Sequence, residues 1–164
     1  MSSQIILGIE TSCDETAAAL LDGYELIHHI TATQLVHTSY GGVVPEYASR
    51  EHNKLLGPVI KSVLKQADYK LSQIDGIAVT QGPGLAGSLL VGLSYAKGLA
   101  LGLQVPLYGI NHIEGHIFAN SGHEKSQALK DCKRMNNWNR SIRHEVHGLQ
   151  LLHRCNRFSQ ELKL

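Results

Sequence analysis

The sequence predicts an α/β fold with one sheet, in which an antiparallel meander is followed by a βαβ unit. Short apolar runs bounded by polar or glycine-rich turns mark the strands, and apolar residues recurring at spacings of three and four mark a helix between them. A chain of 164 residues is long enough for one domain with a buried core. It is too short for two large lobes with a cleft between them.

The first strand is expected at 5–10, where a continuous apolar run ends in the polar cluster 11–16. Strands are expected next at 16–21 and 24–31. They are joined across Asp22-Gly23, because two linking residues with glycine second favour a tight hairpin.

A helix is expected to begin at Pro45 and to kink at Pro58; its apolar face consists of Leu55, Leu56, Val59, Ile60, Val63 and Leu64. A buried strand at 75–80, a glycine-rich loop, a small-residue helix at about 88–103 and a strand at 106–110 follow. Strand, helix and strand within about 35 residues form a βαβ crossover with parallel strands. This is the element order of a ribonuclease-H-like lobe.

The composition changes near residue 120. Residues 1–120 hold 6 Lys+Arg against 10 Asp+Glu, a net charge of −4, whereas residues 121–164 hold 9 against 4, a net charge of +5. Of the 16 glycines, 14 precede Gly122. We therefore predict a domain over 1–119 and a basic segment over 120–164 that is only partly ordered, with Ile142, Val146, Leu149, Leu152 and Cys155 on one face of any helix there.

The three cysteines are odd in number and widely spaced, which favours a reducing compartment over a disulfide-stabilised secreted domain. The N-terminus lacks a basic n-region, and the apolar run 5–9 is too short for a signal peptide or a membrane span. These observations predict a soluble, cytoplasmic protein.

Two motifs are dense in polar or small residues. The turn Glu10-Thr-Ser-Cys-Asp-Glu-Thr16 has hydroxyl groups and main-chain N–H groups for a phosphate, and its carboxylates can hold water or a divalent ion. The alternative is a polar hairpin turn. Glycines in 81–88 allow the backbone close to an anion or to another part of the chain, and a structural tight turn is the favoured reading.

The third motif is Asn111-His-Ile-Glu-Gly-His116. In a helix, His112 and His116 lie on one face at a spacing suited to chelating one metal ion, whereas Glu114 lies on another face. Two surface histidines at helical spacing are the alternative. A third ligand must come from elsewhere. The spacing of His144, His147, His153 and Cys155 matches no zinc module.

Together these motifs resemble the TsaD family, formerly called O-sialoglycoprotein endopeptidases. The matching stretches are 6–17, 41–52, 81–93 and 111–116, and the resemblance covers residues 5 to about 119. It implies a two-lobed fold of the actin/Hsp70/sugar-kinase (ASKHA) type. It also implies transfer of threonylcarbamoyl from its adenylate to N6 of the tRNA adenosine beside the anticodon.

In this family the histidines matching His112 and His116 bind one iron or zinc ion. The turn matching Asp14 and Glu15 is expected to position the donor or the attacking amine. A TsaB-like paralogue is the expected heterodimer partner.

The family continues after this motif into a Ser-Gly-Gly-His-Thr loop and a second lobe with an Asp as third metal ligand. Here Ser121-Gly-His-Glu follows, so the second lobe and the third ligand are expected to be missing. We accordingly expect a truncated chain with little turnover alone, and a frameshift or premature end is the hypothesis for its origin.

The sequence leaves two other functions to consider. A non-catalytic partner-binding module resembling the TsaD/TsaB pairing lobe is the alternative, against which the His112/His116 pair argues, because the paralogue lacks it. A metalloprotease is disfavoured by the position of Glu114 and the missing third ligand.

Overall fold

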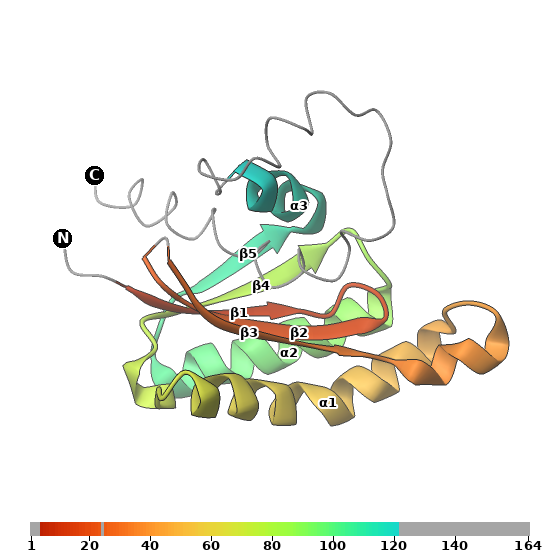
Figure 1. Ribbon diagram of the computed structural model, residues 1–164, viewed down its shortest axis with the longest axis horizontal. Coiled ribbons are helices and arrows are strands. Elements are labelled where there is room, and N and C mark those ends of the chain that lie inside the picture. The colour runs from red at the N-terminus through yellow and green to blue at the C-terminus, as the bar shows by residue number, and fades with distance from the viewer. Residues whose placement is uncertain (1–3, 24, 122–164) are drawn as a thin grey trace.

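In the described part of the chain, five strands form a single sheet in the order β3-β2-β1-β4-β5 (Figure 1). This computed structural model describes residues 4–23 and 25–121. The strands are β1 Ile5–Glu10, β2 Glu15–Asp22, β3 Glu25–Thr33, β4 Gly76–Gly82 and β5 Leu107–Asn111. The α-helices are α1 Pro45–Gln66, α2 Ala86–Leu103 and α3 His112–Ser121, and the short 3-10 helices are η1 Leu35–Tyr40 and η2 Leu71–Gln73.

The pairing of the strands confirms the predicted order of a meander and a βαβ unit. β1, β2 and β3 pair antiparallel, and β4 pairs parallel with both β1 and β5. The hairpin is shifted by one residue from the prediction. Asp22 belongs to β2 and pairs with Glu25, so the connection starts at Gly23, whose φ of +59° glycine adopts readily.

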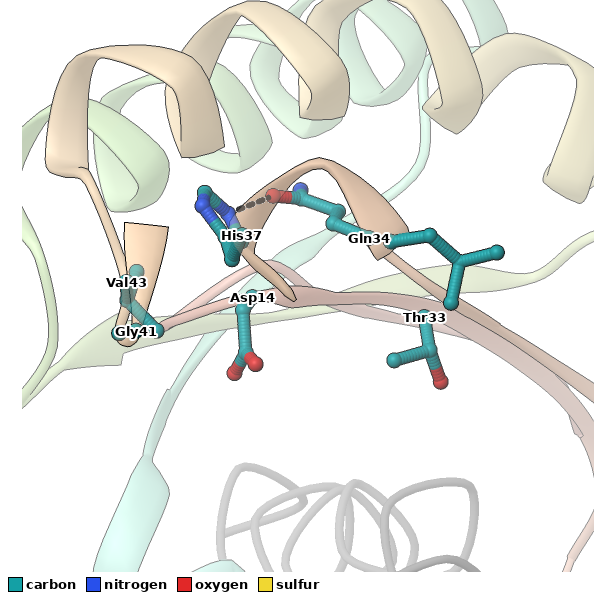
Figure 2. A pocket seen from close by; sticks show the side chains of 8 residues that line it. Asp14, Thr33, Gln34, His37, Gly41 and Val43 are labelled. Atoms are coloured by element: carbon teal, nitrogen blue, oxygen red, sulfur yellow. Dashed lines mark hydrogen bonds between the residues drawn. The ribbon is translucent and has the colours of Figure 1, made fainter. Parts of the chain in front are cut away.

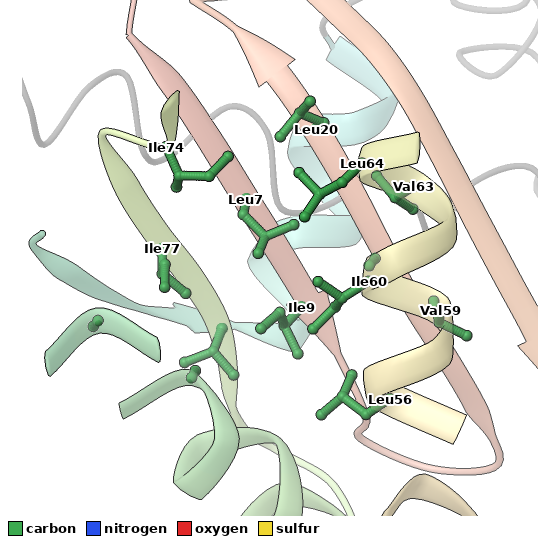
Figure 3. Close-up of a cluster of buried hydrophobic side chains, with 14 of the residues drawn as sticks. Leu7, Ile9, Leu20, Leu56, Val59, Ile60, Val63, Leu64, Ile74 and Ile77 are labelled. Atoms are coloured by element: carbon green, nitrogen blue, oxygen red, sulfur yellow. The ribbon is translucent and has the colours of Figure 1, made fainter. Parts of the chain in front are cut away.

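Helix α1 covers one face of the sheet with the apolar stripe that its sequence predicts. It begins with Pro45 in the first turn, where no N–H partner is needed, and it continues through Pro58. Its buried side chains meet those of β1, β2 and β4 in the main core, shown in Figure 3. The labelled residues of this cluster are Leu7, Ile9, Leu20, Leu56, Val59, Ile60, Val63, Leu64, Ile74 and Ile77.

Helix α2 packs beside α1 on the same face of the sheet (Figure 1). Its buried residues, Ser88, Gly92, Ala96 and Ala100, recur every four positions and are all small, which lets the helix axis approach the sheet. By length and apolar content, α2 is the one helix in the described part of the chain that qualifies as a membrane span. Core helices meet the same criterion.

Three strand ends meet at one edge of the sheet. Because β1, β4 and β5 are parallel, their C-terminal residues Glu10, Gly82 and Asn111 lie at the same edge. Helix α3 begins there, on the opposite side of the sheet from α1 and α2 (Figure 1). The three sequence motifs follow these strand ends, and such an edge is where open α/β sheets bind ligands.

Candidate functional site

The histidine motif forms the first turns of α3, so the helix on which the four-residue spacing depends is present. The side chain of Asn111 accepts hydrogen bonds from the main-chain N–H groups of Ile113 at 3.0 Å and Glu114 at 3.2 Å. This is an N-cap, which starts the helix at His112 directly after β5. The cap fixes the orientation of the first turn and with it the direction of both histidines.

The two imidazoles converge. Nε2 of His112 and Nε2 of His116 are 3.1 Å apart, and the ring centroids are 4.5 Å apart with planes at 86°. Two nitrogens bound to one ion at about 2.0–2.1 Å lie roughly 2.8–3.4 Å apart for ligand angles of about 90° to 109°. The pair therefore fits as two ligands of a metal ion. In the metal-free protein the same spacing suits an N–H···N hydrogen bond.

A buried carboxylate, Glu10, stands behind His112. One oxygen, Oε1, accepts the main-chain N–H of Ser12 at 2.5 Å, and the other, Oε2, accepts the hydroxyl of Thr80. The same Oε2 lies 3.3 Å from Nδ1 of His112, which is also 3.2 Å from the Ser12 hydroxyl. Burial raises the pKa of Glu10. Hydrogen bonds from His112, Ser12 and Thr80 outweigh this effect, so that the pKa falls from its ordinary value of 4.5 to about 2. Glu10 is thus ionised at neutral pH.

The polar turn after β1 is held by both long helices. The Thr11 hydroxyl donates to the Ser88 carbonyl at 2.9 Å, and the Leu85 N–H donates to the Ser12 carbonyl at 2.8 Å. Buried His52 of α1 bonds the Cys13 carbonyl through Nε2 at 2.9 Å and the Thr16 hydroxyl through Nδ1 at 2.8 Å. The turn is therefore a rigid connection that contacts α1, α2 and His112.

The glycine-rich loop approaches this turn closely. A Cβ on Gly84 would lie 2.6 Å from the Ser12 carbonyl oxygen, and a Cβ on Gly92 would lie 2.2 Å from the Thr11 hydroxyl. These glycines let two segments of the chain touch, which supports the reading of the loop as a structural turn. The Gly82–Pro83 peptide bond in this loop is cis.

Asp14 and Glu15 have different surroundings. Asp14 lines an open cavity of about 290 Å³ with Thr33, Gln34, Leu35, His37, Gly41, Gly42 and Val43. Figure 2 shows its carboxylate pointing away from the hydrogen-bonded pair of His37 and Gln34. Burial and a hydrogen bond with Asp14 raise the pKa of the Cys13 thiol to about 11. Glu15 opens β2 opposite Thr33, and the roles of both carboxylates stay predictions.

The described residues contain two convergent metal donors. Within residues 4–23 and 25–121, no group of three His, Cys, Asp or Glu side chains forms a metal site. The tail histidines His144, His147 and His153, together with Cys155 and the apolar face proposed for 142–155, lie outside the described residues.

Sequence reasoning missed three residues of this site. Glu10 begins the polar motif but receives no role of its own, Thr80 is predicted as a strand end, and His52 is part of a matching stretch. One signal was available for Glu10, because a carboxylate that ends an otherwise apolar buried strand needs hydrogen-bond partners. The partners themselves depend on the parallel pairing of β1 with β4.

Comparison with known proteins gives a consistent result. The family model for TsaD, described as tRNA N6-adenosine threonylcarbamoyltransferase, matches residues 25–131. A relative of that name from Clostridium perfringens strain SM101 is 56% identical over 122 residues, which make up 73% of this chain and 36% of the relative. The chain thus spans about a third of the length of the curated relatives it matches.

Two solved structures share the fold. One is an uncharacterized protein with similarity to peptidase YEAZ from Pseudomonas aeruginosa, with a TM-score of 0.59 and 21% identity over 74% of this chain and 49% of that chain. The other is Thermus thermophilus RuvC in complex with a Holliday junction substrate, with a TM-score of 0.53 and 13% identity over 98% of this chain and 96% of that chain. At these identities the likeness concerns the fold, and it confirms the predicted ribonuclease-H-like lobe of the ASKHA type.

The family match runs 12 residues past 119, while the predicted boundary at 119/120 stays a prediction. Since this match covers more than half of the 164 residues, the chain belongs to the TsaD family of tRNA N6-adenosine threonylcarbamoyltransferases.

Proposed function

We propose that this chain supplies the metal-binding lobe of a tRNA N6-adenosine threonylcarbamoyltransferase. The observation that carries the proposal is the His112/His116 pair, whose Nε2 atoms are 3.1 Å apart at the shared edge of β1, β4 and β5. In the reaction, the adenosine N6 forms a bond to the threonylcarbamoyl carbonyl carbon, the bond from that carbon to the phosphate oxygen breaks, AMP leaves, and N6 loses a proton.

The chain's own residues have the following proposed roles. His112 and His116 hold one iron or zinc ion, with further ligands from outside the described residues. When bound, the ion supplies Lewis acidity toward the donor's carbonyl. Asp14 and Glu15 position the donor or the attacking amine. Because the N6 amine is a weak nucleophile, orientation and carbonyl activation are expected to dominate the rate enhancement.

Replacing His112 by alanine is expected to abolish metal binding. One imidazole keeps far less affinity for an ion than a convergent pair, so the Zn²⁺ bound at equilibrium in dialysis should fall to background. Metal analysis by mass spectrometry measures this. The matched control is His28→Ala, because His28 lies on β3 and bonds Gln66 away from the pair; it should retain the wild-type metal content. Equal metal content in both variants would contradict the proposed site.

Catalysis is tested by a graft. Residues 5–119 replace the equivalent region of the Clostridium perfringens relative, and the product is assayed with tRNA, the adenylate donor and a TsaB-like partner. We expect transfer by the graft, loss of transfer on His112→Ala, and little turnover by the 164-residue chain alone. A folded graft that binds metal but forms no product would reject the catalytic role and leave the alternative of a partner-binding module.

We also propose that a TsaB-like paralogue is the partner of this chain and that it docks on the outer face of α2. The proposed location of the pair is the cytoplasm. Leu90 is 64% exposed and Leu101 is 82% exposed. They are 11 positions apart, or about three helical turns, and therefore share one face. Apolar side chains of this size on an open face favour an apolar partner.

Changing Leu101 to Glu is expected to weaken this pairing at least about tenfold, because a charge would be buried in an apolar contact. Analytical ultracentrifugation of the mixed proteins measures the association. The thermal stability of the lone chain should change little, since the side chain is exposed. Ile113→Glu, an exposed substitution on α3, is the control and should pair like the wild type. Unchanged pairing of Leu101→Glu would exclude this face.

A further inference from the structure

We propose that Glu10 is a positioning residue for the metal centre: it accepts a hydrogen bond from Nδ1–H of His112 and so keeps Nε2 of that ring unprotonated, which lets its lone pair bind the ion. The inference rests on the proposed function, since it concerns the same histidine pair. It assigns a task to a buried carboxylate that lies on the Nδ1 side of the His112 ring, whereas Nε2 faces His116.

The first step concerns which atom carries the proton. Nδ1 of His112 lies 3.3 Å from Glu10 Oε2 and 3.2 Å from the Ser12 hydroxyl. A serine hydroxyl can donate or accept, but a carboxylate only accepts. If Nδ1 lacked a proton, its lone pair would face a negative oxygen. The carboxylate therefore selects the Nδ1–H form of the ring, in which Nε2 is unprotonated.

The second step concerns how firmly Glu10 is held. Its side chain is 2% exposed, and it ends β1, between β2 and β4 in the sheet. The Ser12 main-chain N–H and the Thr80 hydroxyl occupy one oxygen each. Both donors come from segments fixed by the sheet or its first turn, so the carboxylate cannot rotate away from His112. A fixed outer carboxylate orients a ligating imidazole, and its loss commonly costs 10–100-fold in metal affinity.

The substitution Glu10→Gln tests the proton assignment directly. A main-chain N–H cannot accept a hydrogen bond, so the amide oxygen must face Ser12 and the amide NH₂ takes the place of Oε2. Nδ1 of His112 would then accept a hydrogen bond and the ring proton would move to Nε2. This is the atom that faces His116, so the metal would have to displace a proton from it.

The experiment has two readouts on the full chain. Long-range ¹H–¹⁵N NMR of the metal-free protein reports which ring nitrogen of His112 is protonated, and competition with a chromophoric chelator gives the affinity for Zn²⁺. We expect Nδ1–H in the wild type, and Nε2–H with roughly 10–100-fold weaker Zn²⁺ binding in Glu10→Gln. Thr16→Val is the control for loss of a buried hydrogen bond, here the one to His52, and should change Zn²⁺ affinity less than about threefold.

Each outcome decides the question. Nε2–H in the wild type overturns the proposal, and this measurement needs no variant, so it remains decisive if Glu10→Gln does not fold. A folded Glu10→Gln that binds Zn²⁺ like the wild type also overturns it, as does equal weakening in Thr16→Val. If the wild type shows Nδ1–H but binds no Zn²⁺, the metal centre of the proposed function is rejected and the orienting contact stands.

Discussion

Replacing Gly92 by alanine is expected to lower the free energy of unfolding by about 1–3 kcal/mol, although alanine is the better helix former. A Cβ at this position would lie 2.2 Å from the Thr11 hydroxyl oxygen and 3.3 Å from its Cβ. Thr11 is fully buried and bonded to the Ser88 carbonyl, so its side chain has no free space to enter. Either α2 or the turn after β1 must move. Urea denaturation followed by circular dichroism measures the change.

Gly98→Ala in the same helix is the matched control. Nothing lies within 4 Å of a Cβ at Gly98, so helix propensity alone acts and the variant should be more stable than the wild type by about 0.4–1 kcal/mol. The two identical substitutions, six positions apart in α2, are thus expected to have opposite signs. Destabilisation of both by the same amount would show that the contact with Thr11 is not the cause.

Replacing His52 by alanine is expected to lower the free energy of unfolding by about 3–5 kcal/mol, because it removes a fully buried ring, the partner of the Thr16 hydroxyl and one of the donors to the Cys13 carbonyl. This is a large fraction of the stability of a domain of this size. Urea denaturation at neutral pH measures it, with His28→Ala as control, since the His28–Gln66 bond is exposed. A loss below about 1 kcal/mol would mean that water replaces the ring without cost.

The same histidine gives a pH dependence whose sign follows from its surroundings. Burial lowers the pKa of His52 below 6.5, outweighing the Cys13 hydrogen bond and the charges of Glu10 and Asp14, which raise it; His37 adds to the lowering. As the pH falls, His52 therefore becomes protonated in the unfolded chain before it does so in the folded chain. The free energy of unfolding falls as the pH drops below about 6.5, and it levels off below the pKa of His52 in the folded chain. His52→Ala should lose less stability than the wild type between about pH 7.5 and about pH 5.5.

The carboxyl of Glu10 acts in a lower window. Its folded pKa of about 2 is below the ordinary value of 4.5, so the stability it contributes is present above 4.5 and is lost as the pH falls through about 2. The effects of Glu10 and His52 on the free energy of unfolding begin at different pH values, near 4.5 and near 6.5, so one series of urea denaturations at decreasing pH measures both.

Elements fixed by local signals were predictable from the sequence. The apolar runs gave β1, β4 and β5, and the stripe after Pro45 gave α1, because burial on one face sets the period of the pattern. The histidine spacing predicted that two rings would converge if the segment were helical, and α3 supplies that helix. The hairpin was one residue off because Asp22 pairs with Glu25, and a turn signal alone does not fix register.

Contacts between distant segments were not predictable in this way. The pairing of β1 with β4 brings Thr80 to Glu10, and nothing in either segment encodes the other. The role of the glycines in 81–88 likewise depended on what the loop approaches, which is the Ser12 carbonyl. Asp14 and Glu15 illustrate the limit of what sequence can predict. Two adjacent carboxylates indicate a chemical role, but the residues that line the cavity beside Asp14 do not identify a ligand.

The bond between Glu10 and His112 spans 102 positions of the chain, and this has a consequence for biosynthesis. Residue 10 leaves the ribosome long before residue 112, and closing so long a loop costs entropy that only the completed sheet offsets. The pair with His116 can therefore be oriented for an ion only after β5 has been translated and added to the sheet edge. Metal binding by nascent chains of increasing length would show at which chain length β5 joins the sheet.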